Sequence, residues 1–355
     1  MLILQLKMCN QGLEFWIKFG WSSQHFVNGF IYLQISWRVK LLLLLSNMIL
    51  KGLGNEGEVC TYLMGDQILT CNSDMQNINL ANQIQEGTTV VMIKNSDGIK
   101  YTNESHRCTK FRQITTYQIS GNDDMEIDEG GFDGLSNLQN LKLNDNMLRV
   151  LKNNVFVGLI QLKKLELINC GIEKLEDNAF HGLNHLETLD LSNNHIKVIS
   201  NHIFKNLRTL TSLSLYHNNV HNLGNECFKG TINLRDIDFT YNKIKHIDTN
   251  TFNELPNLSY LYLSNNEITT VVGDFTCPKL KFLYLSKNKL KEISETMFEK
   301  SQNLIDIDLS FNNIIYVSSK AFFYLNELKY LNYRNNNITD QVQLKFQNSN
   351  PLILS

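Results

Sequence analysis

Apolar residues recur at a fixed spacing over most of the chain. The segment from Leu186 to Leu207, LETLDLSNNHIKVISNHIFKNL, has leucine at positions 1, 4 and 6, asparagine at 9, apolar residues at 11 and 14, phenylalanine at 19 and leucine at 22. Its first position repeats every 24 residues, with one step of 22 after Leu258. The successive first positions are Ile114, Leu138, Leu162, Leu186, Leu210, Leu234, Leu258, Leu280, Leu304 and Leu328.

This spacing predicts one short strand in each repeat. In a strand, side chains alternate between the two faces, so the leucines of the LxL core point to one side and the residues between them to the other. A single repeat cannot bury its apolar side, whereas stacked repeats share a continuous core. We therefore expect ten stacked turns over residues 114–349, each adding a strand to one parallel sheet.

Two further columns support the stack. The asparagine column, where the chain turns inside the stack, predicts a ladder of amides that satisfy buried backbone groups, because a carboxamide donates and accepts at once. It contains Asn122, Asn146, Asn194, Asn218, Asn242, Asn266, Asn288, Asn312 and Asn336, with Cys170 in one repeat. The phenylalanine column predicts an aromatic spine behind the sheet. Its members are Phe132, Phe156, Phe180, Phe204, Phe228, Phe252, Phe298, Phe322 and Phe346, and the short repeat shifts its phenylalanine to Phe275.

The repeat resembles the extracellular leucine-rich repeat family, which includes Toll, Slit and chaoptin ectodomains and secreted insect immune proteins. The resemblance covers residues 114–352, and the segment HRCTKFRQITTYQI is similar to the start of the array in insect members. It implies an α/β right-handed solenoid, a horseshoe with a curved parallel sheet on its concave face and loops and short 3-10 turns on its convex side. It also implies recognition of proteins without catalysis.

The first 54 residues divide into two parts. Residues 1–40 are aromatic and irregular, and we assign no domain to them. Our preferred interpretation is that the true start of the protein lies after them. Arg38 and Lys40 then precede an apolar run from Leu41 to Leu50, which is too short for a membrane span of about 20 residues. A basic start, a short apolar run and small residues are typical of a secretory signal peptide, which we place at 41–54; the alternative is an apolar helix or anchor of a cytosolic protein.

Residues 55–113 are expected to cap the exposed N-terminal end of the stack. Cys60 and Cys71 suit a small hairpin closed by a disulfide, although Cys108 could pair with either of them. Val90 and Ile93 fall in the repeat register and indicate a degraded repeat. Cys170, Cys227 and Cys277 are expected to be free, the first as an inert buried thiol.

The C-terminal end lacks the cysteine-containing cap of the family. A step of 24 from Leu328 reaches Leu352, so residues 350–355 are interpreted as the start of a truncated eleventh repeat. Either a partner covers this end or further sequence follows.

The outward positions of four neighbouring strands carry unusual side chains. Two tyrosine- and phenylalanine-bearing strands lie between two strands that each carry a pair of aspartates. Rigid aromatic side chains supply contact area at little entropic cost, and carboxylates favour a partner with lysine or arginine. We predict a ligand-binding site for a protein with a basic patch, formed by Asp236, Asp238, Tyr260, Tyr262, Phe282, Tyr284, Asp306, Asp308 and Tyr330. The alternative is that the rings only shield the sheet and the aspartates only keep it soluble.

Other functions are disfavoured. A net charge of −2 without a strongly basic end argues against nucleic-acid binding. The histidines are scattered and no HExxH, GxGxxG, phosphate-loop or GxSxG motif occurs, so we expect no catalytic residues, no metal and no cofactor. No downstream run is long enough to span a membrane.

Three glycosylation sequons, at Asn103, Asn257 and Asn337, are compatible with secretion, although a chain this rich in asparagine contains a few by chance. The sequence therefore predicts a secreted or cell-surface recognition module in innate immunity or cell adhesion. Two alternatives remain: a fragment of a membrane-receptor ectodomain, and an intracellular leucine-rich repeat scaffold.

Overall fold

The structure of the protein is a computed structural model. It describes residues 2–9, 12–19, 60–63, 67–72, 83–94, 100–102, 105, 109–338 and 343–354. The chain forms two units, Met1–Glu58 and Val59–Ser355. The first contains an antiparallel pair, β1 (Leu2–Cys9) and β2 (Gly12–Phe19). The predicted signal peptide at 41–54, the sequon at Asn103 and Cys108 lie outside the described residues.

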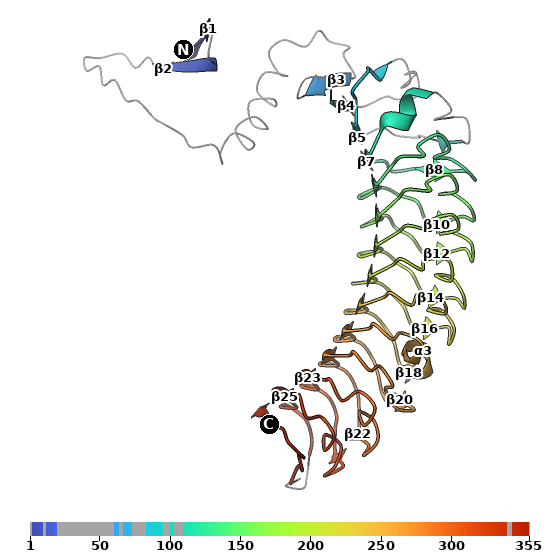
Figure 1. Cartoon of the computed structure of the whole chain (residues 1–355), viewed down its shortest axis with the longest axis vertical. Coiled ribbons are helices and arrows are strands. Elements are labelled where there is room, and N and C mark those ends of the chain that lie inside the picture. Colours follow the sequence, from blue (N-terminus) through green and yellow to red (C-terminus); the bar gives the residue numbers. More distant parts are fainter. Residues whose placement is uncertain are drawn as a thin grey trace. The chain divides into compact units, whose positions relative to one another are not determined.

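The second unit is a stack of turns that share one 14-stranded sheet. The sheet lies on the inner side of the curve of this unit (Figure 1). Its strands pair in parallel, except for the first two, and residues one repeat apart face each other, as Leu189 faces Leu213. In spatial order the strands are β3 (Cys60–Leu63), β4 (Ile68–Asn72), β5 (Val90–Lys94), β7 (Thr116–Ser120), β9 (Asn140–Lys142), β11 (Lys164–Glu166), β13 (Thr188–Asp190), β15 (Ser212–Ser214), β17 (Asp236–Asp238), β19 (Tyr260–Tyr262), β21 (Phe282–Tyr284), β23 (Asp306–Asp308), β25 (Tyr330–Asn332) and β26 (Leu352–Leu354).

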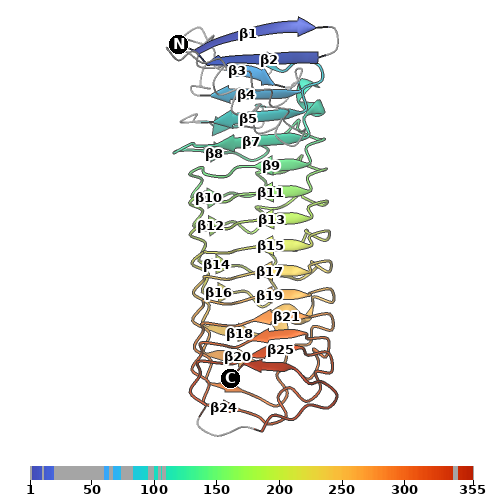
Figure 2. The ribbon, with the colours of Figure 1, turned by 90° about the vertical axis from the view of Figure 1, so that its left-hand side faces the viewer.

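The side of the stack away from the sheet consists of turns and short parallel pairs (Figure 2). Helix is scarce in the described residues: a 3-10 turn η3 (Thr109–Gln113) and one α-helical turn, α3 (Asn250–Asn253), just before the short repeat. This matches the predicted loops and short turns. The paired strands are β6 (Lys100–Tyr101) with β8 (Glu126–Ile127), β10 (Val150–Leu151) with β12 (Lys174–Leu175), β14 (Val198–Ile199) with β16 (Asn222–Leu223), β18 (His246–Asp248) with β20 (Thr270–Val272), and β22 (Glu292–Ile293) with β24 (Tyr316–Val317).

A hairpin forms the N-terminal end of the sheet. Strands β3 and β4 are antiparallel, with Cys60 directly opposite Cys71, and a disulfide joins the two. Strand β4 pairs in parallel with β5, whose Val91 and Ile93 are fully buried. The edge of the sheet is thus the four-residue antiparallel strand β3, and a short edge strand offers other chains few groups to pair with.

The core contains the leucine and phenylalanine columns. Along most strands of the main sheet the burial pattern alternates, as in β19, where Leu261 is fully buried and its neighbours are not. Phenylalanine rings one turn apart stack, for example Phe204 on Phe228 at a centroid distance of 5.9 Å. Phe275 of the short repeat is buried and contacts Phe298, whereas Phe346 is only partly buried. The aromatic spine is therefore confirmed, with its expected shift at Phe275.

The asparagine column forms the predicted ladder. The Asn218 side-chain nitrogen donates to the carbonyl oxygens of Leu191 (2.9 Å) and Leu215 (3.1 Å), and its oxygen accepts from the Ile196 backbone nitrogen (3.1 Å). The same contacts recur along the stack, including across the short repeat at Asn288. Each amide thus supplies hydrogen-bond partners for buried backbone groups that would be costly to leave unpaired.

Cys170 occupies an asparagine position of the ladder and makes a different set of contacts. Its thiol donates to the Leu143 carbonyl oxygen (2.8 Å), and the Leu148 backbone nitrogen donates to the Cys170 carbonyl instead of to a side chain (2.8 Å). The following residue, Gly171, has a φ of +62°, a conformation open to glycine at little cost. Burial raises the pKa of the Cys170 thiol to about 12, so it stays protonated and unreactive.

The register of the last strand differs from the prediction. Leu352 was expected at the buried first position of an eleventh repeat, but it pairs with Tyr330, 22 residues earlier, which is an outward position. Leu352 and Leu354 therefore point outward and are 59% and 44% exposed. The turn from β25 to β26 is two residues shorter than the regular repeat, which a count of 24 from Leu328 cannot reveal.

Candidate protein-binding face

The nine residues predicted to bind a ligand all lie on neighbouring strands of the main sheet. In-register pairing aligns them into two rows across the strands. All of them except the 52% exposed Tyr330 are partly buried. The first row is Asp236, Tyr260, Phe282, Asp306 and Tyr330, and the second is Asp238, Tyr262, Tyr284 and Asp308.

Four rings pack into one array, here called the ring array: Tyr260, Tyr262, Phe282 and Tyr284. The rings of Tyr260 and Phe282 stack with centroids 4.6 Å apart and planes 4° apart. Tyr262 lies 5.3 Å from Tyr284 and 6.3 Å from Tyr260. Because each ring is held by its neighbours, little side-chain entropy remains to be lost when a partner covers the array.

The aspartates beside the ring array have no cationic partner within ion-pair distance among the described residues. The same sheet treats another carboxylate differently. Glu166, on β11, contacts Lys164 at 2.7 Å and Lys142 at 3.4 Å. The face thus neutralises its buried carboxylate near the N-terminal end and leaves those at the ring array uncompensated.

The four aspartates divide into two kinds. In the second row, Asp238 accepts from the Thr240 backbone nitrogen (2.7 Å) and Asp308 from that of Ser310 (2.9 Å), so both hold the turn after their strand. In the first row, Asp306 accepts only from the Tyr284 hydroxyl (3.2 Å), and Asp236 has no side-chain hydrogen bond in the described residues. Neither first-row carboxylate is therefore needed to hold its own turn, and Asp236 has both oxygens free of side-chain hydrogen bonds in the described residues.

The electrostatics of the face agree with this division. Partial burial raises the pKa of Asp236, and the nearby Arg235 opposes part of the shift. Partial burial also raises the pKa of Asp306; the Tyr284 hydroxyl lowers it and the charge of Asp308 raises it. Both carboxylates are ionised at an energetic cost, which a bound cation would reduce.

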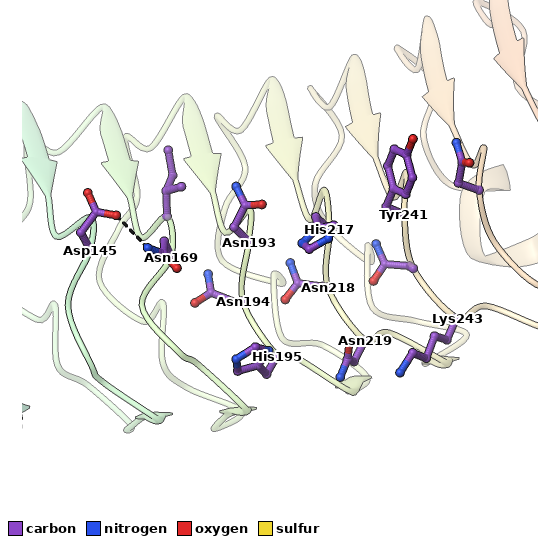
Figure 3. A pocket seen from close by; sticks show the side chains of 13 residues that line it. Asp145, Asn169, Asn193, Asn194, His195, His217, Asn218, Asn219, Tyr241 and Lys243 are labelled. Atoms are coloured by element: carbon purple, nitrogen blue, oxygen red, sulfur yellow. Dashed lines mark hydrogen bonds between the residues drawn. The ribbon is translucent and has the colours of Figure 1, made fainter. Parts of the chain in front are cut away.

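A second concavity, which the sequence pattern did not predict, runs along the loops that leave the strands (Figure 3). It has a volume of about 880 Å³ and is lined mainly by asparagines, with His217, Tyr241 and Lys243. His217 and Tyr241 have φ values of 53° and 57°, at positions that asparagine occupies in other turns, such as Asn193 (57°). The groove repeats the architecture of the asparagine ladder, and spacing alone could not show that Tyr216 and Tyr241 meet edge to face there, 5.6 Å apart.

Two of the predicted sequons lie in the described residues. Asn337 is exposed. The Asn257 side chain donates to the Ile232 carbonyl oxygen (2.9 Å) and accepts from Lys279 (2.7 Å), and similar bonds from Asn233 and Asn303 form a second ladder. Glycosylation of Asn257 would therefore attach the glycan to a nitrogen that already donates a structural hydrogen bond.

No metal-ligating cluster is found among the described residues. Nor does the described part of the chain include a helix with the length and apolar character needed to cross a membrane.

The repeats match a known family. The family model described as "Leucine rich repeat" matches residues 112–172, 160–220, 208–268 and 278–338, which is more than half of the chain. The chain belongs to the leucine-rich repeat family. This confirms the resemblance drawn from the repeat, and the stack of parallel strands confirms the fold. Among curated proteins, no relative matches this leucine-rich repeat chain.

One solved structure shares the fold of this leucine-rich repeat chain, and two others match it at lower TM-scores. A chain of the octameric complex of Latrophilin 3, Unc5D and FLRT2 (LRR) is 22% identical, with a TM-score of 0.62 over 79% of this chain and 84% of that one. Toll, in the Drosophila Toll–Spatzle complex, is 15% identical (TM-score 0.46; 81% of this chain, 53% of that one). TLR13, in a complex with ssRNA13, is 20% identical (TM-score 0.46; 75% and 49%). The chain spans about half the length of the latter two.

Proposed function

We propose that this leucine-rich repeat protein is a non-catalytic recognition module, secreted or at the cell surface, that binds a protein ligand through the ring array and its flanking carboxylates. The ligand carries a basic patch. The observation that carries the proposal is the contrast on one sheet between Glu166, which two lysines contact, and Asp236 and Asp306, which have no described cation within ion-pair distance. A partner with lysine or arginine supplies the missing charge.

The ring array supports the same assignment. Its rings are preorganised by stacking, and only part of their surface is buried within the chain. Aromatic groups held in this way dominate binding at many protein interfaces. Solvation alone would not require four contiguous rings between two carboxylate pairs. Innate immunity and cell adhesion both use recognition of this kind and are the proposed contexts.

A display library of secreted-protein fragments from the same organism tests the proposal. Clones are selected on the wild-type chain and re-tested on Tyr260→Ala and on Thr188→Ala, which alters an uncharged residue of the same sheet outside the ring array. We expect clones with basic patches whose binding falls at least about tenfold on Tyr260→Ala and is unchanged on Thr188→Ala. Clones that bind all three chains equally would refute the proposed site.

The intracellular-scaffold alternative predicts a different covalent state. An oxidising compartment forms the Cys60–Cys71 bond and permits glycan at Asn103 or Asn337. Peptide mapping of the protein purified from its native source distinguishes the two: reduced cysteines and unmodified sequons would favour the scaffold.

A further inference from the structure

The geometry of the first row defines the segment that a partner must present. We propose that the partner binds through an extended segment with two basic side chains four residues apart and an apolar side chain midway between them. This inference rests on the proposed function and adds the conformation and spacing of the ligand.

The distance between the two first-row carboxylates sets the spacing. Asp236, Tyr260, Phe282 and Asp306 are successive in-register neighbours on β17, β19, β21 and β23. Adjacent strands lie about 4.8 Å apart, so three steps separate the two aspartates by about 14 Å. An extended chain rises about 3.4 Å per residue and covers this distance in about four residues.

The two-residue alternation of side chains in an extended chain places all three required side chains on the side that faces the sheet. Side chains two residues apart point to the same side, so residues i, i+2 and i+4 all face the sheet when the segment crosses its strands. Residue i+2 then lies about 7 Å from each end, above the boundary between β19 and β21. That is where the Tyr260 and Phe282 rings stack, 4.6 Å apart. An apolar side chain at i+2 thus meets the ring pair while i and i+4 meet the carboxylates.

A helical ligand fits less well. Residues on one helix face recur at i+7 and i+11, at rises of about 10 and 16 Å, and the intermediate spacings point to other faces. The required distance of about 14 Å lies between the two. The extended segment matches both the distance and the direction of its side chains.

The second row gives the segment its position on the sheet. Asp238 and Asp308 each hold a backbone nitrogen of their own turn, whereas Asp236 and Asp306 do not, so a ligand can bind the first-row pair without competing with a turn. A segment lying over the first row contacts Tyr330 at the end of that row, where the side chain is 52% exposed. The second-row charges add long-range attraction for the same cationic segment.

Peptides of one composition test the spacing directly. The peptide GRSFSRG carries its arginines four residues apart with phenylalanine midway; its isomers GRSFRSG and GSRFRSG carry them three and two apart. Each is immobilised through a biotin at its N-terminus, and the dissociation constant of the full-length chain is measured by biolayer interferometry at low ionic strength. We expect GRSFSRG to bind at least about fivefold more tightly than either isomer.

Variants of the chain distinguish the spacing from general charge attraction. Asp236→Asn or Asp306→Asn removes one of the two anchors and should abolish the preference among isomers, whereas Asp190→Asn, the same change on the same sheet outside the two rows, should preserve it. Equal binding of the isomers to the wild-type chain would overturn the spacing, and the proposed site would still stand if that binding fell on Tyr260→Ala. Absence of binding to any of the immobilised peptides at a chain concentration of about 1 mM, at which even weak recognition is detectable, would also overturn the inference.

Discussion

The rings of Tyr260 and Phe282 stack across strands β19 and β21, with centroids 4.6 Å apart and planes 4° apart. The pair lies on the outward side of strands whose inward residues, Leu261 and Leu283, are fully buried. One strand thus presents a core side and a separate aromatic surface. The two sides should respond differently to substitution, and this difference separates a binding surface from a protective one.

Tyr260→Ala should cost at most about 1.5 kcal/mol of unfolding free energy, because it removes a stacked pair from a partly exposed surface. Leu261→Ala, the adjacent inward residue, should cost about 3 kcal/mol through the cavity it leaves. Urea denaturation of both variants measures the difference. If the two losses were equal, the rings would belong to the structural core, as the shielding alternative requires.

The carboxylate of Asp306 should make stability depend on pH. Its raised pKa, caused mainly by partial burial, means that the folded state binds the proton more readily than the unfolded state does. The stabilising effect of that proton is complete below the unfolded pKa and is lost as pH rises through the folded pKa. At pH 7 the ionised group therefore destabilises the fold.

Asp306→Asn should accordingly raise the unfolding free energy at pH 7 by less than about 1 kcal/mol, since solvent screens a partly exposed charge, and the gain should vanish in strong acid. Thermal melts of the variant and wild-type chains across this range provide the measurement. A gain that persisted unchanged into strong acid would show that the stabilisation arises from something other than the charge. The same substitution should weaken ligand binding, a trade of stability for function.

The asparagine ladder should be intolerant of substitution. Asn218→Ala leaves the Ile196 backbone nitrogen unpaired in the core and removes one of the two amide donors from the carbonyl oxygens of Leu191 and Leu215. The substitution should cost about 3 kcal/mol. Asn219→Ala, one residue on and partly exposed, should change stability by less than about 0.5 kcal/mol. Chemical denaturation compares them, and a mild Asn218→Ala phenotype would mean that water replaces the amide.

The Cys60–Cys71 disulfide should stabilise the N-terminal end of the stack. The two residues are 11 apart in sequence, and closing a loop of this size is worth about 3 kcal/mol in the chain-entropy model. Cys60→Ser with Cys71→Ser should therefore increase hydrogen exchange in β4 and β5 while exchange in β17 to β23 stays unchanged, because each turn contacts only its neighbours. Uniformly faster exchange would show that the cap controls the whole stack.

The sequence predicted the repeated features because they depend on spacing alone. Leucine, asparagine and phenylalanine columns each recur once per turn, so their burial follows from counting. Local exceptions to the repeat could not be predicted by counting. At Cys170 a backbone carbonyl, followed by the left-handed Gly171, accepts the hydrogen bond that an asparagine side chain accepts elsewhere. The repeat that leads to Leu352 is two residues shorter than the period.

The candidate site was predictable in its location but not in its chemistry. In-register strands place Asp236, Tyr260, Phe282 and Asp306 side by side, as their repeat positions require. The distinct roles of the first- and second-row aspartates depend on side-chain rotamers and on backbone nitrogens two residues on. The neutralisation of Glu166 likewise depends on how two lysines fold over the sheet.

The central claim is that a protein ligand covers the ring array, and site-specific photocrosslinking tests it most directly. A benzophenone amino acid is placed at Tyr262, beside Tyr260, or at Val198, which is 47% exposed on β14 away from the main sheet. Each chain is irradiated with the ligand clones obtained by display. The account predicts crosslinks from position 262 and none from position 198; crosslinks from position 198 alone would place the ligand on another surface and contradict it.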